Sequence, residues 1–501
     1  MKNLFLTFAL LLFGASSCAA DLSGNWIVRK PRTDGTFEDS YLNLKQEDDH
    51  LTGGIRFNQF YFKIVESTVA ADGFTLTAAN IEPGSHWQLK IEGKLAGDAL
   101  QLTVHQHSNT PPMQVVAHHA PAGEGALPLR IPPPALHVVP DNGLAKTPPM
   151  GWNSWNKFAE HVDDAAVRGM ADAMVSSGMR DAGYIYVNID DTWELGRDAQ
   201  GQILTNKKFP DMKTLADYVH SRGLKIGIYS SPGPNTCAGY EGSYGHEVQD
   251  AKTYAAWGID YLKYDWCGAN NMFTDEEMPA VYQIMGDALL KSGRPILYSL
   301  CQYGRHDVWK WGAQVGGNAW RTTGDISDKW DSMAKIGFGQ NDLAPYAKSG
   351  HWNDPDMLEI GNGGMTDDEY KTHMSLWSML SAPLLAGNDL RSMTPNIAAI
   401  LMNREVIAVD QDPDGHQGQR IAKSGDQEVW TKPLAGGAHA VALLNRGAAP
   451  AKITVKWSDL GLKSAPSHVK DLWSHSEVKL TGPDYSAEVP GHGVVLLRIT
   501  H

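Results

Sequence analysis

The sequence predicts a multidomain protein: a central (β/α)8 TIM barrel with an N-terminal all-β domain before it and a C-terminal antiparallel β-sandwich after it. Three observations support this fold class: a length of 501 residues, a change near residue 150 to strand-like runs alternating with amphipathic helices, and a return to short alternating runs from about residue 419. So long a chain exceeds a single core, and strand–helix alternation is typical of βα units. The predicted segments are a signal peptide (1–20), an N-terminal β domain (21–120), a Pro-rich linker (121–146), the barrel (147–415) and the sandwich (416–501).

The first twenty residues are typical of a signal peptide. Lys2 precedes an apolar run from Leu4 to Phe13, and small residues then lead to Ala20. Such a run is too short to span a bilayer. We therefore expect cleavage near Ala20 and a secreted or periplasmic protein with no membrane span. Lipid attachment at Cys18 is the alternative, and it is disfavoured because Ala15 stands where lipoprotein signals usually carry leucine.

The N-terminal segment shows short alternating apolar runs separated by Gly and Asp clusters. This pattern predicts an antiparallel sandwich or a small barrel, with strands at 24–28, 41–44, 60–65, 74–76, 87–91 and 100–104. Such an accessory domain either binds polysaccharide or supports the barrel. The prolines that follow, including Pro132, Pro133 and Pro134, predict a stiff extended linker.

Eight strand-like runs in the central segment predict the barrel. They are Met150 to Asn153, Tyr184 to Ile189, Lys225 to Tyr229, Tyr261 to Tyr264, Ile296 to Leu300, Ala319 to Thr322, Gly350 to Trp352 and Pro383 to Ala386. Helices with recognisable ends lie between them, such as 211–222 before Gly223 and a capping box at Thr366 and Glu369. In a barrel of this kind the chemistry takes place at the carboxyl ends of the strands.

Acidic residues are concentrated at these predicted strand ends. They are Asp190, Asp191, Asp265, Asp325, Asp354 and Asp356. A single aspartate after a strand more often caps a helix or pairs with a lysine than catalyses a reaction. Here, however, acids follow four predicted strands whose carboxyl ends converge on one mouth of the barrel. A catalytic site explains this concentration better than four separate structural roles. Two carboxylates flanking a scissile bond are what glycoside hydrolysis requires.

Period-2 alternation selects two of these acids. Lys263 and Asp265 share one face of their strand, so the lysine favours the ionised carboxylate that a nucleophile needs. Asp325 follows Arg321 in a Gly-bearing loop, and its position at the rim suits a general acid that must later admit water.

Composition and cysteine content restrict the partners. A net charge of −14 and a pI near 5.7 argue against nucleic acid and anionic membranes, whereas 16 tryptophans are consistent with stacking on a carbohydrate substrate. The sequence contains no phosphate-binding glycine motif, zinc-ligand spacing or calcium loop, so we expect no cofactor and no metal. Cys237 and Cys267 follow two successive predicted strands, and we expect a disulfide between them.

Five motifs carry a family resemblance. Met150 to Trp155, Asn188 to Trp193, Tyr261 to Cys267, Trp320–Arg321 with Asp325, and Trp352 to Met357 resemble glycoside hydrolase family 27, which contains α-galactosidases and α-N-acetylgalactosaminidases. The resemblance runs from about Thr147 to Arg420, and more weakly beyond. It implies a retaining double displacement with Asp265 as nucleophile and Asp325 as acid/base.

The resemblance also implies a sugar pocket. Its substrate-binding residues would be Trp155, Asp190, Asp191, Tyr229, Lys263, Gln302, Arg321 and Asp356. Short carboxylates at 190 and 191 leave room for a hydroxymethyl group, and the large Gln302 and Tyr303 disfavour an N-acetyl group. The implied substrate is a terminal α-D-galactoside. Cys301 is expected to be a free thiol, because Gly317 stands where the partner cysteine of some relatives lies.

Several other functions remain open. Within the same family, the alternatives are an α-N-acetylgalactosaminidase and a β-L-arabinopyranosidase. A Schiff-base lyase using Lys263 is disfavoured, because the neighbouring Asp265 keeps the lysine protonated. A non-catalytic carbohydrate-binding protein would lack one of the two acids, and both Asp265 and Asp325 are present.

Overall fold

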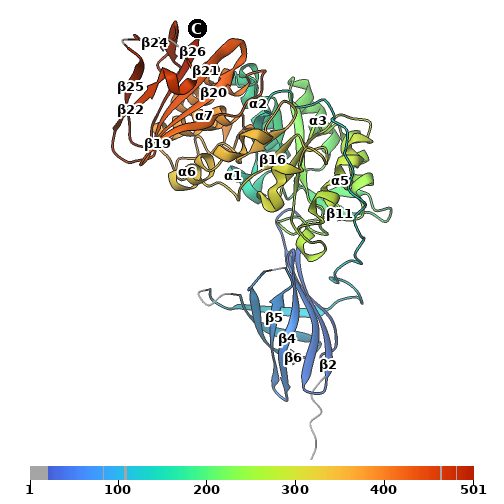
Figure 1. Ribbon diagram of the computed structural model, residues 1–501. Helices are drawn as coiled ribbons and strands as arrows, with labels where there is room; N and C mark the ends of the chain where they lie inside the picture. Colours follow the sequence, from blue (N-terminus) through green and yellow to red (C-terminus); the bar gives the residue numbers. More distant parts are fainter. Residues whose placement is uncertain (1–20, 83, 107–109, 463–464, 481, 501) are drawn as a thin grey trace, which may run out of the picture. The chain divides into compact units, whose positions relative to one another are not determined.

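The computed structural model describes residues 21–500 except 83, 107–109, 463–464 and 481, and it divides into two compact units (Figure 1). One unit contains Phe37–Pro128 together with the residues up to Arg32, and the other contains Thr33–Thr36 and the chain from Leu129 onward. The expected signal peptide, with Cys18, lies outside the described residues. In the part of the chain that the structure describes, no helix combines the length and apolarity needed to cross a bilayer.

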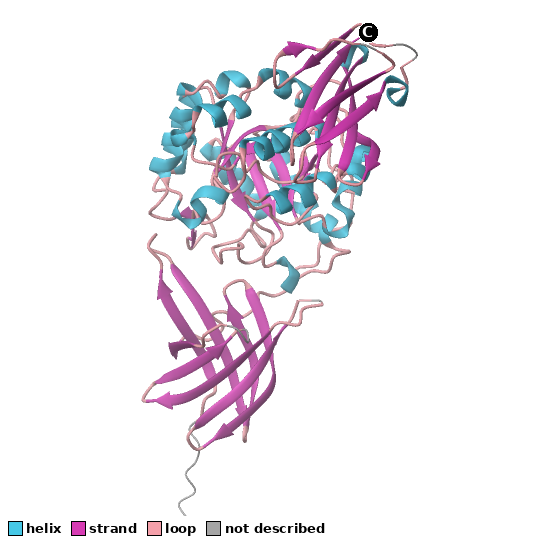
Figure 2. Ribbon diagram, turned by 90° about the vertical axis from the view of Figure 1, so that its left-hand side faces the viewer, coloured by secondary structure: helices cyan, strands magenta, loops and turns pink. Residues whose placement is uncertain are grey.

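The N-terminal unit is a closed antiparallel barrel, which decides between the two architectures that the sequence left open (Figure 2). Its strands are β1 (Gly24–Pro31), β2 (Phe37–Glu47), β3 (His50–Phe57), β4 (Phe60–Ala70), β5 (Gly73–Asn80), β6 (Gln88–Ala96), β7 (Ala99–His105) and β8 (Met113–His119). Alternate residues point inward and fill the barrel with a continuous apolar core that includes Trp26, Leu42, Phe62 and Leu100.

Two strands of this barrel, β3 and β8, were not anticipated. Glycines interrupt the apolar alternation of β3, but the structure needs them there. A Cβ at Gly53 would lie 1.9 Å from the carbonyl oxygen of Asn43 on β2, so only glycine permits this close approach. In β8 only Ala117 is fully buried, which leaves a weak periodic signal.

The second unit contains the (β/α)8 barrel, as the sequence predicted (Figure 2). The eight parallel strands are β9 (Met150–Asn153), β10 (Tyr186–Asn188), β13 (Lys225–Ser230), β14 (Tyr261–Asp265), β15 (Leu297–Cys301), β16 (Ala319–Arg321), β17 (Trp352–Asp354) and β18 (Leu384–Ala386). They are ordered β17-β16-β15-β14-β13-β10-β9-β18. A parallel bridge between Leu358 and Ala386 joins the segment after β17 to β18, so the two edge strands meet.

Helices follow the strands and cover the outside of the sheet. They are α1 (Trp155–Phe158), α2 (Asp164–Ser176), α3 (Met212–Ser221), α4 (Glu247–Trp257), α5 (Met278–Leu290), α6 (Trp330–Phe338), α7 (Asp367–Leu380), α8 (Pro395–Leu401) and α9 (Arg404–Asp410). A short hairpin of β11 (Glu194–Arg197) and β12 (Ile203–Thr205) follows β10. The expected capping box is present at the start of α7, where the Thr366 and Glu369 side chains each accept a hydrogen bond from the other residue's backbone N–H.

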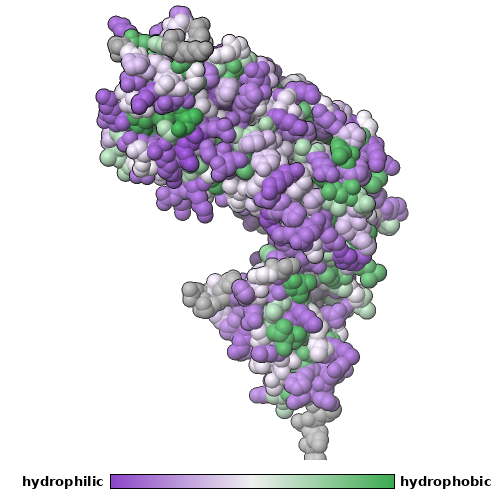
Figure 3. Space-filling model, in the orientation of Figure 1, coloured by the Kyte–Doolittle hydropathy of each residue, from purple (hydrophilic) through white to green (hydrophobic). Residues whose placement is uncertain are grey.

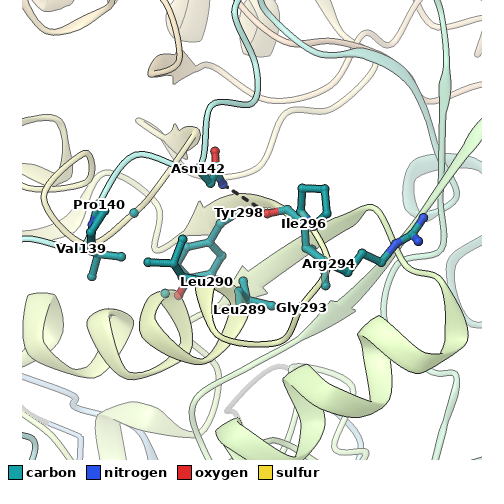
Figure 4. Close-up of a pocket in the computed structure, with 12 residues that line it drawn as sticks. Val139, Pro140, Asn142, Leu289, Leu290, Gly293, Arg294, Ile296 and Tyr298 are labelled. Carbon is teal, nitrogen blue, oxygen red and sulfur yellow. Dashed lines mark hydrogen bonds between the residues drawn. The ribbon is translucent and has the colours of Figure 1, made fainter.

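The linker residues 129–142 belong to the second unit, and some of them border a cavity of about 230 Å³ (Figure 4). Val139 and Pro140 face Leu289, Leu290 and Tyr298 across this cavity, and Asn142 donates a hydrogen bond to the carbonyl oxygen of Ile296. The cavity lies at the amino-terminal end of β15, and its lining contains no acid among the described residues. That end of a TIM barrel contributes to stability rather than to catalysis.

The surface is mostly hydrophilic in the view of Figure 3, with small hydrophobic patches. The linker supplies several exposed apolar side chains, namely Leu129, Ile131, Leu136 and Val138. These side chains are exposed because the linker is a single extended, proline-rich segment that cannot bury them within itself.

The C-terminal part of the second unit is the β-sandwich that the sequence predicted. Its two antiparallel sheets are formed by β19 (Gln419–Ser424), β20 (Gln427–Leu434), β21 (Ala438–Asn445), β26 (Val494–Thr500), β23 (His468–Asp471) and β24 (Ser476–Glu477), and by β22 (Ala451–Lys456) with β25 (Asp484–Val489). Alternate apolar residues, including Val441, Leu443, Ile453 and Leu497, form the core between the sheets.

A buried lysine fastens this sandwich to the barrel. Lys432 on β20 donates to the Ser381 hydroxyl at 2.7 Å, to the carbonyl of Ser378 at 2.9 Å and to the carbonyl of Val409. Burial lowers the pKa of Lys432 to about 8, although the nearby Asp410 carboxylate acts in the opposite direction. The hydrogen bonds of Lys432 therefore depend on a buried ammonium group, which the three acceptors and the Asp410 carboxylate keep protonated.

Replacing Lys432 by methionine is expected to lower the free energy of unfolding by about 3 kcal/mol, because it leaves two buried carbonyls and the Ser381 hydroxyl without their donor and removes the charge that favours the ionised form of the buried Asp410. Urea denaturation of the full chain measures this. The matched control is Lys452→Met on the exposed face of β22, which should change stability by less than about 0.5 kcal/mol. Equal effects of the two substitutions would contradict this assignment.

Candidate active site

The carboxyl ends of the barrel strands surround a cavity of about 610 Å³, which we call the active-site cavity. Its lining includes nine of the ten residues that the sequence indicated as catalytic or substrate-binding, namely Trp155, Asp190, Asp191, Tyr229, Lys263, Asp265, Arg321, Asp325 and Asp356. They come from loops and strand ends spread over some 200 residues of sequence. Parallel strands in a barrel account for this, because their carboxyl ends all meet at one mouth.

Asp265 is the last residue of β14 and points into the cavity. Its neighbours Leu262 and Tyr264 are fully buried away from the cavity, as the alternation along the strand predicted. Oδ1 of Asp265 accepts the backbone N–H of Trp266 at 2.8 Å. Burial raises the pKa of Asp265, while the Lys263 ammonium, the Tyr303 hydroxyl and the Trp266 N–H all lower it.

Lys263 supports the neighbouring acids rather than Asp265 alone. Its Nζ donates to Oδ2 of Asp190 at 2.8 Å, and that oxygen also accepts from the Asn153 amide at 2.9 Å. The ammonium still lies close enough to Asp265 to favour its ionised form. One lysine therefore serves two carboxylates of the cavity.

Asp191 is held by the backbone on both sides. Its Oδ1 accepts the N–H of Thr192 at 2.6 Å, and its Oδ2 accepts the N–H of Ala238 at 2.8 Å. Burial raises its pKa to about 7, and the charge of Asp190 adds to this rise. The Thr236 side chain also hydrogen-bonds this carboxylate and lowers its pKa, so fewer of its lone pairs remain for a hydroxyl group of a ligand.

Arg321 connects two acids on the far side of the cavity. Its Nη2 lies 3.0 Å from Oδ1 of Asp325 and 3.0 Å from Oδ2 of Asp356. Asp356 is buried and also accepts the N–H groups of Met357 and Ile326. The Asp325 side chain, in contrast, is 73% exposed. The Asp325 carboxylate is therefore open to water, unlike the other acid that Arg321 contacts.

A disulfide joins Cys237 and Cys267 at the edge of the cavity, as expected, and Cys301 is buried and free. The two sulfur atoms and an oxygen of Asp265 lie within 4.8 Å of one another. Sulfur atoms bonded to each other are not the thiolates that a metal requires, so this grouping is not a metal site. Instead, the disulfide forms a fixed wall beside Asp265.

Two aromatic side chains complete the predicted set. Trp155 begins α1, and its backbone N–H donates to Oδ1 of Asn153, which places the indole at the rim. Tyr229 is the penultimate residue of β13 and its ring is buried, and its hydroxyl lies 3.8 Å from Sγ of Cys267. A flat indole beside a polar pocket suits stacking on the apolar face of a pyranose ring.

Gln302, the tenth residue, is placed apart from this lining. It is fully buried, and its Nε2 donates to the carbonyl oxygen of Arg321 at 3.2 Å. The next residue, Tyr303, faces the cavity instead, because the chain turns there. The sequence motif located this turn but did not show which of its side chains points inward.

The sequence reasoning missed several other residues of the cavity lining. They are Asn156, Lys157, Ala159, Ser327, Asp328, Met357, Glu359 and Asn362. Most of these residues lie within five positions of a predicted site residue, and this proximity was the available signal. Glu359 accepts hydrogen bonds from Asn156 and Asn362, and burial raises its pKa to about 7.

Comparisons with known proteins agree with this geometry. Residues 147–412 match the family model described as alpha galactosidase A, and residues 424–499 match the alpha galactosidase C-terminal beta sandwich domain. The chain is 53% identical to an alpha-galactosidase of Coffea arabica over 364 residues, which cover 72% of this chain and 95% of that protein.

Solved structures show the same relationship. The alpha-galactosidase I of Mortierella vinacea superposes with a TM-score of 0.69 at 41% identity, covering 72% of this chain and 98% of the other. The alpha-galactosidase of Saccharomyces cerevisiae, solved with raffinose, gives a TM-score of 0.65 at 30% identity, covering 72% of this chain and 98% of that one.

Proposed function

This chain belongs to glycoside hydrolase family 27 and is a hydrolase of α-galactosides, and we propose that Asp265 and Asp325 carry out the reaction by double displacement with retention of configuration. The observation that carries the proposal is the contrast between the two acids within one cavity. Asp265 is buried, accepts a backbone N–H and has its pKa lowered by a lysine and a phenol, whereas Asp325 is open to solvent. A fixed nucleophile and a solvent-accessible proton donor are the two parts that this mechanism needs.

In the first step an oxygen of Asp265 attacks the anomeric carbon. The bond from that carbon to the glycosidic oxygen breaks, and Asp325 gives its proton to the departing oxygen. The product is a galactosyl ester on Asp265 and a free alcohol. The exposed position of Asp325 gives the alcohol a way out of the cavity.

In the second step Asp325, now a carboxylate, takes a proton from water. The water oxygen attacks the anomeric carbon, and the bond to Asp265 breaks with its electron pair returning to the carboxylate. Two inversions give net retention, so the first product is α-galactose. Both acids return to their starting protonation states.

The remaining cavity residues bind the sugar. Trp155 offers a stacking surface, and Asp190, Asp191, Lys263 and Arg321 offer charged partners for hydroxyl groups. The two short carboxylates leave room for the hydroxymethyl group of galactose. The leader sequence supports export, so the proposed site of action is the periplasm or the outside of the cell.

A panel of nitrophenyl glycosides tests this proposal. We expect α-galactoside to be hydrolysed at least tenfold faster, by kcat/KM, than α-N-acetylgalactosaminide or β-L-arabinopyranoside. Tyr303 leaves little space for an acetamido group, and arabinopyranose lacks the hydroxymethyl contact, which alone is worth about tenfold or more. A preference for another glycoside would keep the mechanism and overturn the assigned sugar. Cleavage of none of them would overturn the proposed function.

A further inference from the structure

The turn that follows β15 has a backbone that its sequence does not favour. The N–H of Arg305 donates to the carbonyl of Gln302 at 3.1 Å, and the two residues between them have φ angles of 62° at Tyr303 and 79° at Gly304. These are the angles of a type I′ turn. Glycine fits the second position, since a Cβ there would lie 2.2 Å from the carbonyl oxygen of Thr322.

Tyrosine does not fit the first position of such a turn. Left-handed backbone is unfavourable for a residue with a Cβ, and this position usually holds Asn, Asp or Gly. Thr192 and Asp356, at two other strand ends of the cavity, share this feature with φ angles of 86° and 89°. Strain of this kind is concentrated at functional sites, so the presence of Tyr303 calls for a functional explanation.

The strained backbone directs the Tyr303 side chain at the nucleophile. Its hydroxyl lies 3.6 Å from Sγ of Cys237 and 3.9 Å from Sγ of Cys267, and these two sulfur atoms lie within 4.8 Å of a carboxylate oxygen of Asp265, so the phenol and the carboxylate are neighbours in the cavity. The guanidinium of Arg321 lies 5.8 Å from its ring centroid. The disulfide and the arginine therefore hold the phenol in place beside a carboxylate that already accepts the Trp266 N–H.

We propose that Tyr303 is a catalytic residue whose hydroxyl donates a hydrogen bond to Asp265 throughout the reaction; this rests on the proposed function. In the first step the hydrogen bond keeps the Asp265 carboxylate ionised and oriented toward the anomeric carbon. In the second step it stabilises the carboxylate as the bond to the sugar breaks. The proton stays on the tyrosine in both steps, because burial and the Asp265 charge raise the pKa of Tyr303 far above neutral pH.

The groups around Asp265 determine how the Tyr303 hydroxyl changes the pKa of this carboxylate. The titratable groups that surround it are Lys263 on its own strand, Asp190 after β10, Tyr229 on β13, Cys301 on β15 and Tyr303 after β15, whereas Tyr282 on α5 lies outside the cavity lining. Lys263 and the Tyr303 hydroxyl lower the pKa of Asp265, and Asp190 raises it. Removing the hydroxyl must therefore raise this pKa. Asp265 acts as the ionised form, so the acidic limb of the activity profile moves to higher pH.

The test compares Tyr303→Phe with wild type and with Tyr282→Phe. Tyr282 is a matched control, because its buried hydroxyl has no hydrogen-bond partner in the described part of the chain. We expect Tyr303→Phe to lower kcat/KM for an α-galactoside at least tenfold and to move the acidic limb up by about one pH unit, since a hydrogen bond to a charged group is worth this much. With a dinitrophenyl galactoside it should also show a burst, because release of the sugar from Asp265 becomes slow.

The outcomes separate this inference from the proposed function. If wild type hydrolyses the α-galactoside and Tyr303→Phe has the wild-type rate and pH profile, the role of Tyr303 is wrong and the proposed function stands. If wild type and Tyr282→Phe hydrolyse no galactoside, both are wrong. A purely structural role would lower the melting temperature of Tyr303→Phe without moving the acidic limb, and this result would also overturn the inference.

Discussion

Asp265→Asn is expected to lower kcat for every α-galactoside by about 10⁴-fold or more, because the amide oxygen is too weak a nucleophile to displace the aglycone. Binding should change much less, since the sugar keeps Trp155, Asp190, Asp191 and Arg321. Steady-state rates with nitrophenyl galactoside, together with isothermal calorimetry with galactose, measure the two effects separately.

A second substitution shows whether the lost group is the nucleophile. In Asp265→Gly, added azide should take the place of the carboxylate and give β-galactosyl azide, the product of a single inversion. Asp217→Asn on the exposed face of α3 is the control for loss of a carboxylate, and it should retain wild-type activity. Appreciable activity of Asp265→Asn that survives repurification would show that another group attacks the sugar.

Asp325→Ala is expected to make the rate depend strongly on the leaving group. For a galactoside whose leaving group is an alcohol, kcat/KM should fall about 10³-fold, the typical contribution of a general acid. For a dinitrophenyl leaving group, which departs without protonation, kcat/KM should fall less than about tenfold. The exposed position of Asp325 lets azide enter, so turnover should recover with release of α-galactosyl azide.

Loss of the same size for both leaving groups would show that Asp325 does not donate the proton. The product of azide rescue separates the two acids, because the nucleophile variant gives the β anomer and the acid/base variant gives the α anomer. Asp328→Asn is a useful comparison, since this acid lies three residues further along the same loop and also lines the cavity. It should keep the wild-type ratio of rates for the two leaving groups.

Much of the barrel was predictable because the residue patterns of its strands and helix ends match the structure that these segments adopt in the fold. Parallel strands covered on both faces appear as apolar runs, and helix ends such as Thr366 with Glu369 have recognisable caps. Once the strands were placed, the acids at their ends had to converge on one mouth. The alternation Lys263–Tyr264–Asp265 then gave the orientation of the nucleophile.

Other features depend on contacts that no local pattern records. Strand β3 was missed because Gly53 is required by the close approach of β2, a tertiary contact that breaks the apolar alternation. The inward position of Tyr303 in place of Gln302 depends on two left-handed residues in succession, and tyrosine does not predict such a turn. The pairing of Lys263 with Asp190 likewise joins two residues that are 73 positions apart in the sequence.

The most direct test of the mechanism is to identify the acid that carries the sugar. An activated α-galactosyl fluoride whose intermediate hydrolyses slowly should label the enzyme once, and mass spectrometry of a digest should place the galactosyl group on Asp265. With an ordinary substrate, proton NMR should show α-galactose as the first product. A label on any other acid, or an unlabelled enzyme that releases β-galactose first, would contradict the account.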